Sequence, residues 1–253
     1  MEGFTQVRLL RKGPRATLTF ARPEALNALS PTLVSEALAA TRLVAASDAR
    51  VLVVTGEGRS FSAGVDLKAV SQPGYDREAF FAEARALARL FETMPQATIA
   101  RITGHCFTGG LELALGCDFM VAADEALFCD THAKLGFRPA WGLSQRLPRR
   151  VGQTRAREMS FTARRLSARE AKEIGLILDA VPAAELDKRI DALVEMIVAN
   201  SAGSIGAYKR LFDAALTLDY EAGLEFEATA DLPVADRKER QAAVTGSLGQ
   251  GRG

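Results

Sequence analysis

The sequence predicts an α/β fold followed by a helical C-terminal portion. Strand-like apolar runs alternate with helical patterns up to about Ala180, and helical patterns alone follow. Hydrophobic residues make up 48% and charged residues 25% of the 253 residues, which fits a packed globular core. In the stretch from residue 99 to residue 118, an apolar run, a glycine-rich turn and good helix formers follow one another. These three observations indicate layers of strands and helices.

The first part of the chain offers two short strands, a helix and a buried strand. Apolar runs at residues 7–10 and 16–20 flank a Lys-Gly-Pro turn, which predicts a pair of strands. A serine followed by a proline at residues 30–31 predicts a helix start, because serine caps free amides and proline fits the first turn. This helix should end near Ala46. The uninterrupted apolar run at 50–56 indicates a strand buried on both faces.

The clearest helical pattern lies in the next part of the chain. It begins at Asp76 and ends before Pro95, because apolar side chains recur along it at steps of three and four. Strands are expected to follow at residues 97–103 and 119–123, with a shorter one at 126–130.

The later part of the chain is predicted to contain a loop and then helices. The segment 136–152, which carries the only tryptophan, is expected to form a loop. Ser167 and Glu170 form a capping-box pattern that predicts a short helix. An amphipathic pattern at 186–197 predicts another helix, and helical patterns continue from Ser204.

Net charge and cysteine usage exclude several classes of function. The 32 basic and 31 acidic residues leave a formal net charge of +1, so neither nucleic acid nor a membrane surface is an expected partner. No apolar run approaches the ~20 residues that span a bilayer, and residues 1–12 lack the apolar core of a secretory signal. Three cysteines without a CxxC pair favour reduced thiols and a cytoplasmic location. Two histidines are too few to predict a metal site.

Two stretches of small residues remain after the common catalytic motifs are excluded. The glycines at residues 56–61 lack the third glycine of a dinucleotide fingerprint, and neither a P-loop nor a GxSxG nucleophile elbow occurs. The stretches 62–64 and 108–110 each follow an expected strand, and either one alone also fits a simple tight turn. If their amides converge, they form a two-donor oxyanion hole for a carbonyl group.

Four motifs follow one another in the order typical of one family. FSAGVDL at residues 61–67 and GHCFTGGLELALGCD at 104–118 resemble paired motifs of the crotonase superfamily, the enoyl-CoA hydratases and isomerases. RPEALNAL at 22–29 and SAREAKEIGLI at 167–177 are similar to further parts of its pattern. The resemblance runs from about residue 7 to residue 181.

The resemblance implies a spiral of repeated ββα units over residues 1–195 and a helical trimerisation region over 196–253. It also implies a homotrimer or a dimer of trimers, and an acyl-CoA thioester substrate. Coenzyme A would enter as part of the substrate, with no separate cofactor. The device shared by the family is an oxyanion hole that holds the enolate formed from the thioester carbonyl, and its two donors match the amides of Ala63 and Gly109.

The resemblance also assigns residues that bind the substrate. The positions matched to coenzyme A contacts are Arg22, Ala25, Leu26, Ser62, Asp66, Leu67 and Lys68. Basic side chains such as Arg22 and Lys68 can pair with phosphates. Phe137 and Trp141 are expected to line the acyl pocket, and a tryptophan there should make it smaller. Where the family carries an aromatic residue and a lysine near its C-terminus, this chain has Ala-Val-Thr-Gly at 243–246.

One of the two catalytic glutamates of the hydratases has a counterpart. Glu112 matches the first, which holds and deprotonates the water that adds to the β-carbon. The second is missing, and His132 stands at its place, twenty positions after Glu112. Histidine can act as an acid or a base near neutral pH, so His132 is expected to protonate the α-carbon. A surface or packed histidine without a catalytic part is the alternative.

Three functions remain open, in order of preference. The first is an enoyl-CoA hydratase-like lyase. The second is another reaction of the superfamily that uses His132, such as acyl-CoA or carbon–carbon hydrolysis or an isomerisation. Members that cleave diketones use a similarly placed histidine together with an acid in the following loop, where this chain has Trp141. The third is a non-catalytic acyl-CoA binder, because one acid/base residue is absent.

Overall fold

The computed structural model describes residues 3–242 and is organised around a sheet of six strands. In their order across the sheet these are β1 (Val7–Lys12), β2 (Arg15–Phe20), β3 (Val51–Gly56), β4 (Ala97–Ile102), β6 (Phe119–Ala123) and β9 (Asp179–Val181). β1 and β2 are antiparallel, and each later pair of neighbours is parallel. Every residue of β3 is buried, as its apolar run predicts for a parallel strand covered on both faces.

A smaller sheet accompanies the first. It consists of β5 (His105–Phe107), β7 (Leu127–Cys129) and β8 (Leu166–Ser167), with β7 in the middle. Helix α3 (Gly109–Ala114) follows β4 and β5, and helix α4 (His132–Leu135) follows β6 and β7. Each of these turns adds one strand to each sheet before its helix forms, which is the predicted ββα spiral.

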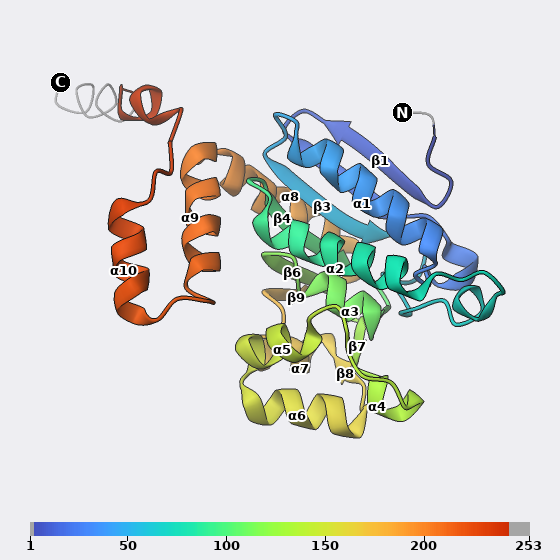
Figure 1. Cartoon of the computed structure of the whole chain (residues 1–253). Coiled ribbons are helices and arrows are strands. Elements are labelled where there is room, and N and C mark those ends of the chain that lie inside the picture. The colour runs from blue at the N-terminus through green and yellow to red at the C-terminus, as the bar shows by residue number, and fades with distance from the viewer. Residues whose placement is uncertain (1–2, 243–253) are drawn as a thin grey trace.

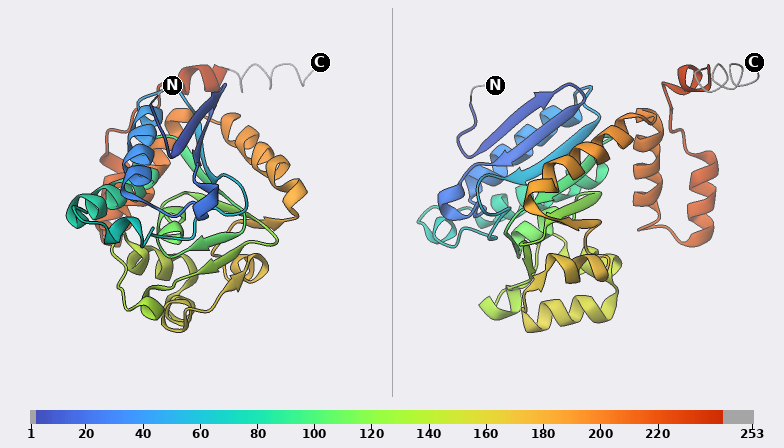
Figure 2. Two further views of the ribbon diagram at one scale, coloured as in Figure 1. Left: turned by 90° about the vertical axis from the view of Figure 1, so that its right-hand side faces the viewer. Right: turned by 180° about the vertical axis from the view of Figure 1, so that it is seen from behind.

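Helices cover both faces of the larger sheet. Within the described residues, further helices are α1 (Pro31–Ala45), α2 (Arg77–Thr93), α5 (Leu143–Val151), α6 (Gln153–Thr162), α7 (Ala168–Glu173), α8 (Leu186–Val198), α9 (Ala202–Ala214) and α10 (Tyr220–Thr229). Short 3-10 turns in the same part of the chain are η1 (Pro23–Ala25), η2 (Ala69–Ser71) and η3 (Ala183–Glu185). α1 and α2 lie in front of the sheet in Figure 1, and α8 lies in front of it in the reverse view of Figure 2. On that second face Ile190 of α8 belongs to one apolar cluster with Val53 and Ile99 of the sheet.

Three predicted helix starts are confirmed by their capping contacts. The side chain of Ser30 caps α1 and that of Asp76 caps α2, each accepting a hydrogen bond from an amide of the first turn. Ser167 and Glu170 form a reciprocal capping box at the start of α7. Because a cap of this kind contributes about 1 kcal/mol, local chemistry that is visible in the sequence decides where these helices begin.

The loop predicted for residues 136–152 is wrong over its second half. Leu143–Val151 form α5, which begins directly after Gly142. Only two side chains of this helix are buried, Leu143 and Leu147, and they lie four positions apart. Two apolar positions are too few to distinguish a helix from a loop by the spacing of hydrophobic residues.

The C-terminal helices leave the body of the molecule. α9 and α10 form an arm that projects beyond α8 (Figure 1 and Figure 2). The predicted boundary at residue 195 falls inside α8, whose buried side chains pack on the sheet as far as Ile197. The exposed large hydrophobic side chains of the arm are Tyr208, Phe212, Leu216, Leu218, Tyr220 and Leu224. The Ala-Val-Thr-Gly stretch at 243–246 lies outside the described residues.

Residues 3–242 contain neither a single membrane-spanning helix nor a cluster of metal-binding side chains. No single helix there is long and apolar enough to cross a bilayer, and only Ala183–Val198 and Ala202–Ala214, bent by 99° at their junction, reach that length and composition together. The same range holds no group of three His, Cys, Asp or Glu side chains placed to bind a metal ion.

Candidate active site

The two stretches of small residues converge in the structure. A parallel bridge joins Ser62 to Cys106. Gly110 lies so close to Ser62 that an added Cβ would stand 2.8 Å from the Cβ of that serine. Gly64, with φ +99°, faces the carbonyl of Phe107, 3.1 Å from the position of an added Cβ. Glycine is needed at both places, because a side chain would push the two stretches apart.

The two predicted oxyanion donors differ in what they already bind. The Gly109 N–H, the first amide of α3, is hydrogen-bonded to no acceptor within residues 3–242. The Ala63 N–H donates to the carbonyl of Leu26 over 3.0 Å. The expectation of two free amides therefore changes to one free donor at Gly109 and one occupied donor. The Ala63 N–H can bind a ligand only if it shares its hydrogen between the ligand and the Leu26 carbonyl, or if it gives up the bond to that carbonyl.

Glu112 is buried, and one of its two carboxylate oxygens is fixed. The residue is 2% exposed, and Oε1 accepts hydrogen bonds from the N–H groups of Trp141 (2.9 Å) and Leu143 (3.1 Å). Burial raises the pKa of Glu112, although these hydrogen bonds and the nearby His132 limit the rise. A carboxylate whose pKa is moved toward neutrality suits a general base.

His132 faces the second oxygen of Glu112 and is held from its other side by Asp130. Nε2 of His132 lies 3.6 Å from Oε2 of Glu112, and Nδ1 lies 2.6 Å from Oδ1 of Asp130. Burial disfavours the charged form of Asp130, but hydrogen bonds from His132 and Ser160 outweigh it, so the pKa of Asp130 lies below its usual value. An ionised Asp130 accepts the Nδ1–H, which leaves Nε2 to exchange protons on the side of Glu112.

Two threonines join the elements that carry this acid–base pair. Thr108 precedes α3 and Thr131 precedes α4, and their hydroxyl groups are hydrogen-bonded to each other. The Thr131 N–H also donates to Oγ1 of Thr108 over 3.2 Å, and the Thr108 N–H donates to the carbonyl of Cys129 over 2.8 Å. Thr108 adopts φ +49°, which is unusual for a β-branched residue. These contacts fix the starts of both helices, and so the spacing of Glu112 and His132.

The residues matched to coenzyme A gather in two loops that contact each other. The Leu29 N–H donates to the carbonyl of Gly64 over 2.7 Å, and the Asp66 N–H donates to the carbonyl of Leu29 over 3.1 Å. Nη1 of Arg22 lies 2.8 Å from Oδ2 of Asp66. The structure therefore brings the matched residues of the first loop against those of the second.

These residues differ in how accessible they are. Ser62 is buried, and its hydroxyl donates to the carbonyl of Asn27 over 2.8 Å. Leu67 and Lys68 are exposed. The half-buried members of the set are Arg22, Ala25, Leu26 and Asp66. The side chains open to a ligand are thus those of Leu67 and Lys68, whereas Ser62 helps to hold the loop shape.

The two residues matched to the acyl pocket lie in different surroundings. Trp141 is 3% exposed, and its ring meets that of Phe80 edge-on with centroids 5.4 Å apart. It also covers Gly109, where an added Cβ would lie 2.5 Å from Cζ3 of the indole. Phe137, by contrast, is 55% exposed in the segment after α4. Trp141 therefore lies next to the residue with the free amide, and Phe137 faces solvent.

The contacts that orient the acid–base pair were not predicted from the sequence. Oδ1 of Asp130 also accepts the backbone N–H of His132 over 3.1 Å, a turn in which a short side chain caps the residue two positions on. The Asp-x-His spacing before a short helix was the available signal. The hydrogen bonds from the amides of Trp141 and Leu143 could not be predicted, because every residue except proline carries a backbone N–H and the sequence does not show which of them binds a side chain.

A buried carboxylate beside an imidazole and a free amide defines a site that polarises a carbonyl and moves protons next to it. On a spiral of ββα units, this places the protein in the class of crotonase folds. The pattern of the enoyl-CoA hydratase/isomerase family matches residues 14–248. The chain belongs to this family, which confirms the resemblance and the predicted fold class.

Individual relatives are similar over most of the chain. The short-chain-enoyl-CoA hydratase of Clostridium acetobutylicum is 31% identical over 225 residues, which cover 88% of this chain and 86% of the relative. The crystal structure of enoyl-CoA hydratase from Bacillus anthracis has a TM-score of 0.89 at 31% identity, covering 96% of this chain and 97% of that one. A crystal structure from Thermobifida fusca in complex with acetoacetyl-CoA has a TM-score of 0.82 at 31% identity, covering 90% of this chain and 93% of that one.

Proposed function

We propose that this chain is an enoyl-CoA hydratase-like lyase, which adds water across the double bond of a 2-enoyl-CoA thioester. The observation that carries the proposal is the 3.6 Å between Nε2 of His132 and Oε2 of Glu112. A water beside these atoms is within reach of both. Hydration needs one group that takes a proton from water and another that supplies a proton to the α-carbon. The relatives named enoyl-CoA hydratase support the same reaction.

Glu112 acts as the base in this reaction. Its ionised Oε2 takes a proton from the water, whose oxygen bonds to the β-carbon while the double-bond electrons move into an enolate. The Gly109 N–H stabilises the enolate oxygen, and the Ala63 N–H joins it when the Leu26 carbonyl shares or yields that donor. Protonated His132 gives its Nε2 proton to the α-carbon. The proton on Glu112 then returns to His132, so water is the only reactant added.

We propose that coenzyme A enters as part of the substrate, along the loops 22–29 and 62–68, and that no separate cofactor takes part. The exposed ammonium of Lys68 suits a phosphate group. The Thermobifida fusca structure with acetoacetyl-CoA supports acyl-CoA binding in this family. Trp141 and Phe137 remain the proposed residues of the acyl pocket.

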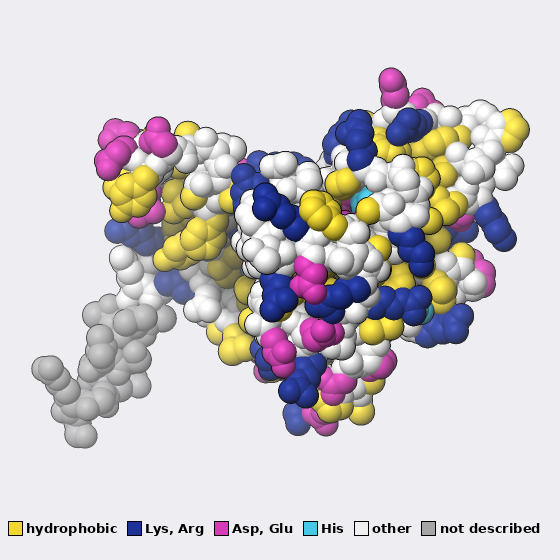
Figure 3. Space-filling view, turned by 90° about the horizontal axis from the view of Figure 1, so that it is seen from below, with side chains coloured by type: hydrophobic (Ala, Val, Ile, Leu, Met, Phe, Trp, Pro, Cys, Tyr) yellow, Lys and Arg dark blue, Asp and Glu magenta, His cyan; other side chains and the backbone are white. Residues whose placement is uncertain are grey.

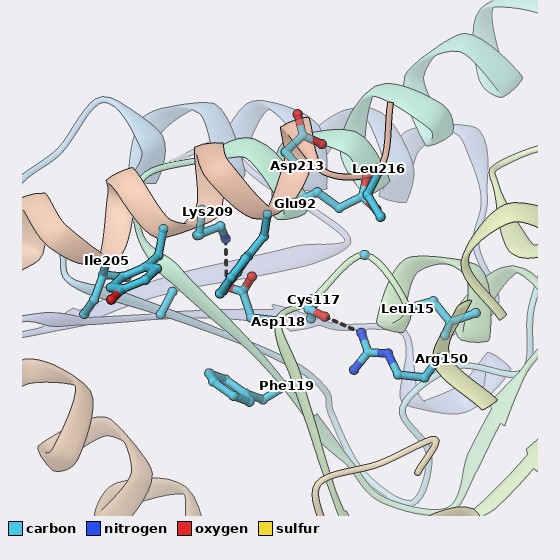
Figure 4. A pocket seen from close by; sticks show the side chains of 14 residues that line it. Glu92, Leu115, Cys117, Asp118, Phe119, Arg150, Ile205, Lys209, Asp213 and Leu216 are labelled. Atoms are coloured by element: carbon cyan, nitrogen blue, oxygen red, sulfur yellow. Dashed lines mark hydrogen bonds and ion pairs between the residues drawn. The ribbon is translucent and has the colours of Figure 1, made fainter. Parts of the chain in front are cut away.

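We propose that the chain forms a homotrimer or a dimer of trimers through its C-terminal arm. Hydrophobic side chains gather over this arm in Figure 3, and Phe212 and Tyr220 are 67% and 77% exposed. A pocket of about 600 Å³ lies between α9 and the body of the molecule, and its lining includes apolar residues such as Phe119 and Ile205 beside charged ones (Figure 4). Exposed apolar surface of this kind marks an interface, so we expect other subunits to cover it.

The cysteines support a cytoplasmic location, which we also propose. Cys106, Cys117 and Cys129 are buried free thiols. Burial raises the pKa of Cys117 to about 12, so its thiol stays protonated and unreactive. Unpaired thiols of this kind are typical of a reducing compartment.

The test follows the conjugated enone absorbance of short, medium and aryl 2-enoyl-CoA thioesters, together with product masses. Hydration removes the absorbance and adds the mass of one water. Glu112→Gln is expected to abolish this change, and His132→Gln to slow it by ~10²–10⁴-fold. Glu125→Gln is the matched control, because Glu125 is exposed and is not one of the residues proposed to bind or convert the substrate.

The other two functions give different products in the same assay. Release of free coenzyme A thiol that is lost in His132→Gln would favour hydrolysis. Binding without any product would favour a non-catalytic binder. If the wild-type protein hydrates none of the acyl chains, the proposal is wrong.

A further inference from the structure

The segment that holds Glu112 is itself held by an arginine. The N–H groups of Trp141 and Leu143 both donate to Oε1 of Glu112. Nη1 of Arg146, one turn along α5, donates to the carbonyl of Trp141 over 2.6 Å. One peptide segment is therefore bound to the carboxylate on one side and to the guanidinium on the other.

Glu92 fixes this guanidinium in a two-point ion pair. Nε of Arg146 lies 2.6 Å from Oε1 of Glu92, and Nη2 lies 2.8 Å from Oε2. The two side chains are only 16% and 20% exposed, so solvent screens the pair weakly. A planar guanidinium that binds a carboxylate through two parallel bonds has little freedom to rotate. Because Glu92 lies in α2, the pair ties α5 to a helix of the core.

Gly142 allows the guanidinium to lie against the backbone. This residue has φ +115°, and an added Cβ would stand 2.1 Å from Nη1 of Arg146. Gly142 lies between the two residues whose amides bind Glu112. The guanidinium therefore rests on the same short segment that supplies both donors, and a side chain at this position would displace it.

We propose that Arg146 and Glu92 are positioning residues that aim the Glu112 carboxylate at its reacting partner through the backbone of residues 141–143. The inference rests on the proposed function and adds two residues to the machinery. When the guanidinium is lost, the segment relaxes and both hydrogen bonds to Oε1 weaken. Oε2 then loses its fixed direction, and the ionised form of Glu112 loses two donors that stabilise it. A displacement of about 1 Å at a reacting group can cost ~10²-fold in rate.

The first experiment needs no turnover, because Trp141 is the only tryptophan of the chain. Its intrinsic fluorescence is titrated with pH in the whole protein, and Glu112→Gln identifies the transition that belongs to Glu112. In Arg146→Lys and Glu92→Gln the midpoint is expected to move to higher pH. Glu92→Gln separates the loss of positioning from the direct effect of a changed charge. Removal of a negative charge alone would lower the pKa of Glu112 and move the midpoint to lower pH.

The second experiment measures kcat and KM with the 2-enoyl-CoA that the wild-type protein hydrates. Arg146→Lys and Glu92→Gln are expected to lower kcat by ~10–10²-fold while KM changes little. In Arg146→Ala, added guanidinium ion is expected to restore part of kcat. Arg101→Lys is the matched control, because Arg101 is 19% exposed and pairs with Asp187, away from residues 141–143. It should leave the midpoint and kcat unchanged.

Three results would overturn the inference. The first is a fluorescence midpoint and a kcat equal to those of the wild type in both Arg146→Lys and Glu92→Gln. The second is a fluorescence midpoint that moves to lower pH in Glu92→Gln. The third is failure of both variants to fold while Arg101→Lys folds, because the pair would then serve stability alone. If the wild-type protein hydrates no enoyl-CoA, the proposed function fails, while the fluorescence titration still decides on the positioning role.

Discussion

Nε2 of His132 faces Oε2 of Glu112 at 3.6 Å, and the other polar atom of each side chain is already hydrogen-bonded. Asp130 holds the imidazole from one side, and the amides of Trp141 and Leu143 hold the carboxylate from the other. The distance between the two groups is longer than an ordinary hydrogen bond. The surroundings therefore set the geometry of the pair, and its two facing atoms are the ones that remain for proton exchange.

Removal of the charge on Asp130 is expected to slow hydration without abolishing it. In Asp130→Asn the side chain keeps its size, but no carboxylate fixes the Nδ1–H tautomer of His132. We expect kcat to fall by less than the ~10²–10⁴-fold loss of His132→Gln, with KM nearly unchanged. Steady-state kinetics on both variants measure this order. Asp124→Asn, at an exposed position, is the control, and a wild-type kcat in Asp130→Asn would show that Asp130 does not act on His132.

The pH dependence of hydration follows from the shifted pKa of Glu112. Burial raises this pKa above the ordinary value of 4.5, and the base must be ionised to accept a proton from water. Activity is therefore present above the raised pKa and is lost as pH falls through it. We expect the acidic limb of kcat/KM to lie above pH 4.5 in the wild type and to persist in His132→Gln. An acidic limb at or below the ordinary value would contradict the role of Glu112 as the base.

Much of the fold could be predicted because its signals are local. The capping side chains of Ser30 and Asp76 predict the starts of their helices, and the apolar run of β3 predicts a buried strand. Helix α5 could not be predicted, since only Leu143 and Leu147 are buried in it, and two positions do not define an apolar face. Its place in the fold depends on contacts with other elements, and these are not encoded in a local pattern.

The sequence suggested which residue types make up the candidate site, but not the hydrogen bonds and ion pairs between them. The motifs pointed to Glu112 and His132 as candidate residues, and the structure brings the two side chains together. That the Ala63 amide is occupied by Leu26 depends on residues 37 positions apart. The pair of Arg146 and Glu92 joins residues 54 positions apart. Contacts of such separation arise from the tertiary fold, so single-sequence reasoning had no means to find them.

The arm is expected to depend on one buried ion pair for its attachment. Nζ of Lys209 in α9 lies 2.7 Å from Oδ2 of Asp118, as drawn in Figure 4, and also donates to the carbonyls of Phe91 and Gln96. Lys209→Met leaves the carboxylate and two carbonyls without their cation. We expect the free energy of unfolding to fall by about 3 kcal/mol, the lower end for a broken buried pair, because Asp118 is partly exposed.

Urea unfolding at a fixed protein concentration measures this loss. Lys188→Met is the control, because Lys188 and its partner Glu185 are largely exposed, and its midpoint should equal that of the wild type. Equal midpoints for Lys209→Met and the wild type would show that the attachment of the arm does not depend on this ion pair.

Trp141 is expected to limit the length of the acyl chain. Its buried ring fills the space against Gly109 and Phe80, next to the free amide. Trp141→Ala removes the indole but keeps the backbone N–H that donates to Glu112. We expect the ratio of kcat/KM for 2-decenoyl-CoA over crotonyl-CoA to rise by at least ~10-fold, since each methylene that a pocket accepts or rejects is worth ~10–200-fold. The substitution also costs ~3–5 kcal/mol of stability, so circular dichroism must first show that the variant is folded. Phe161→Ala, at a 76% exposed position, should leave the ratio unchanged. If the ratio also stays unchanged in folded Trp141→Ala, the acyl chain does not run along this ring.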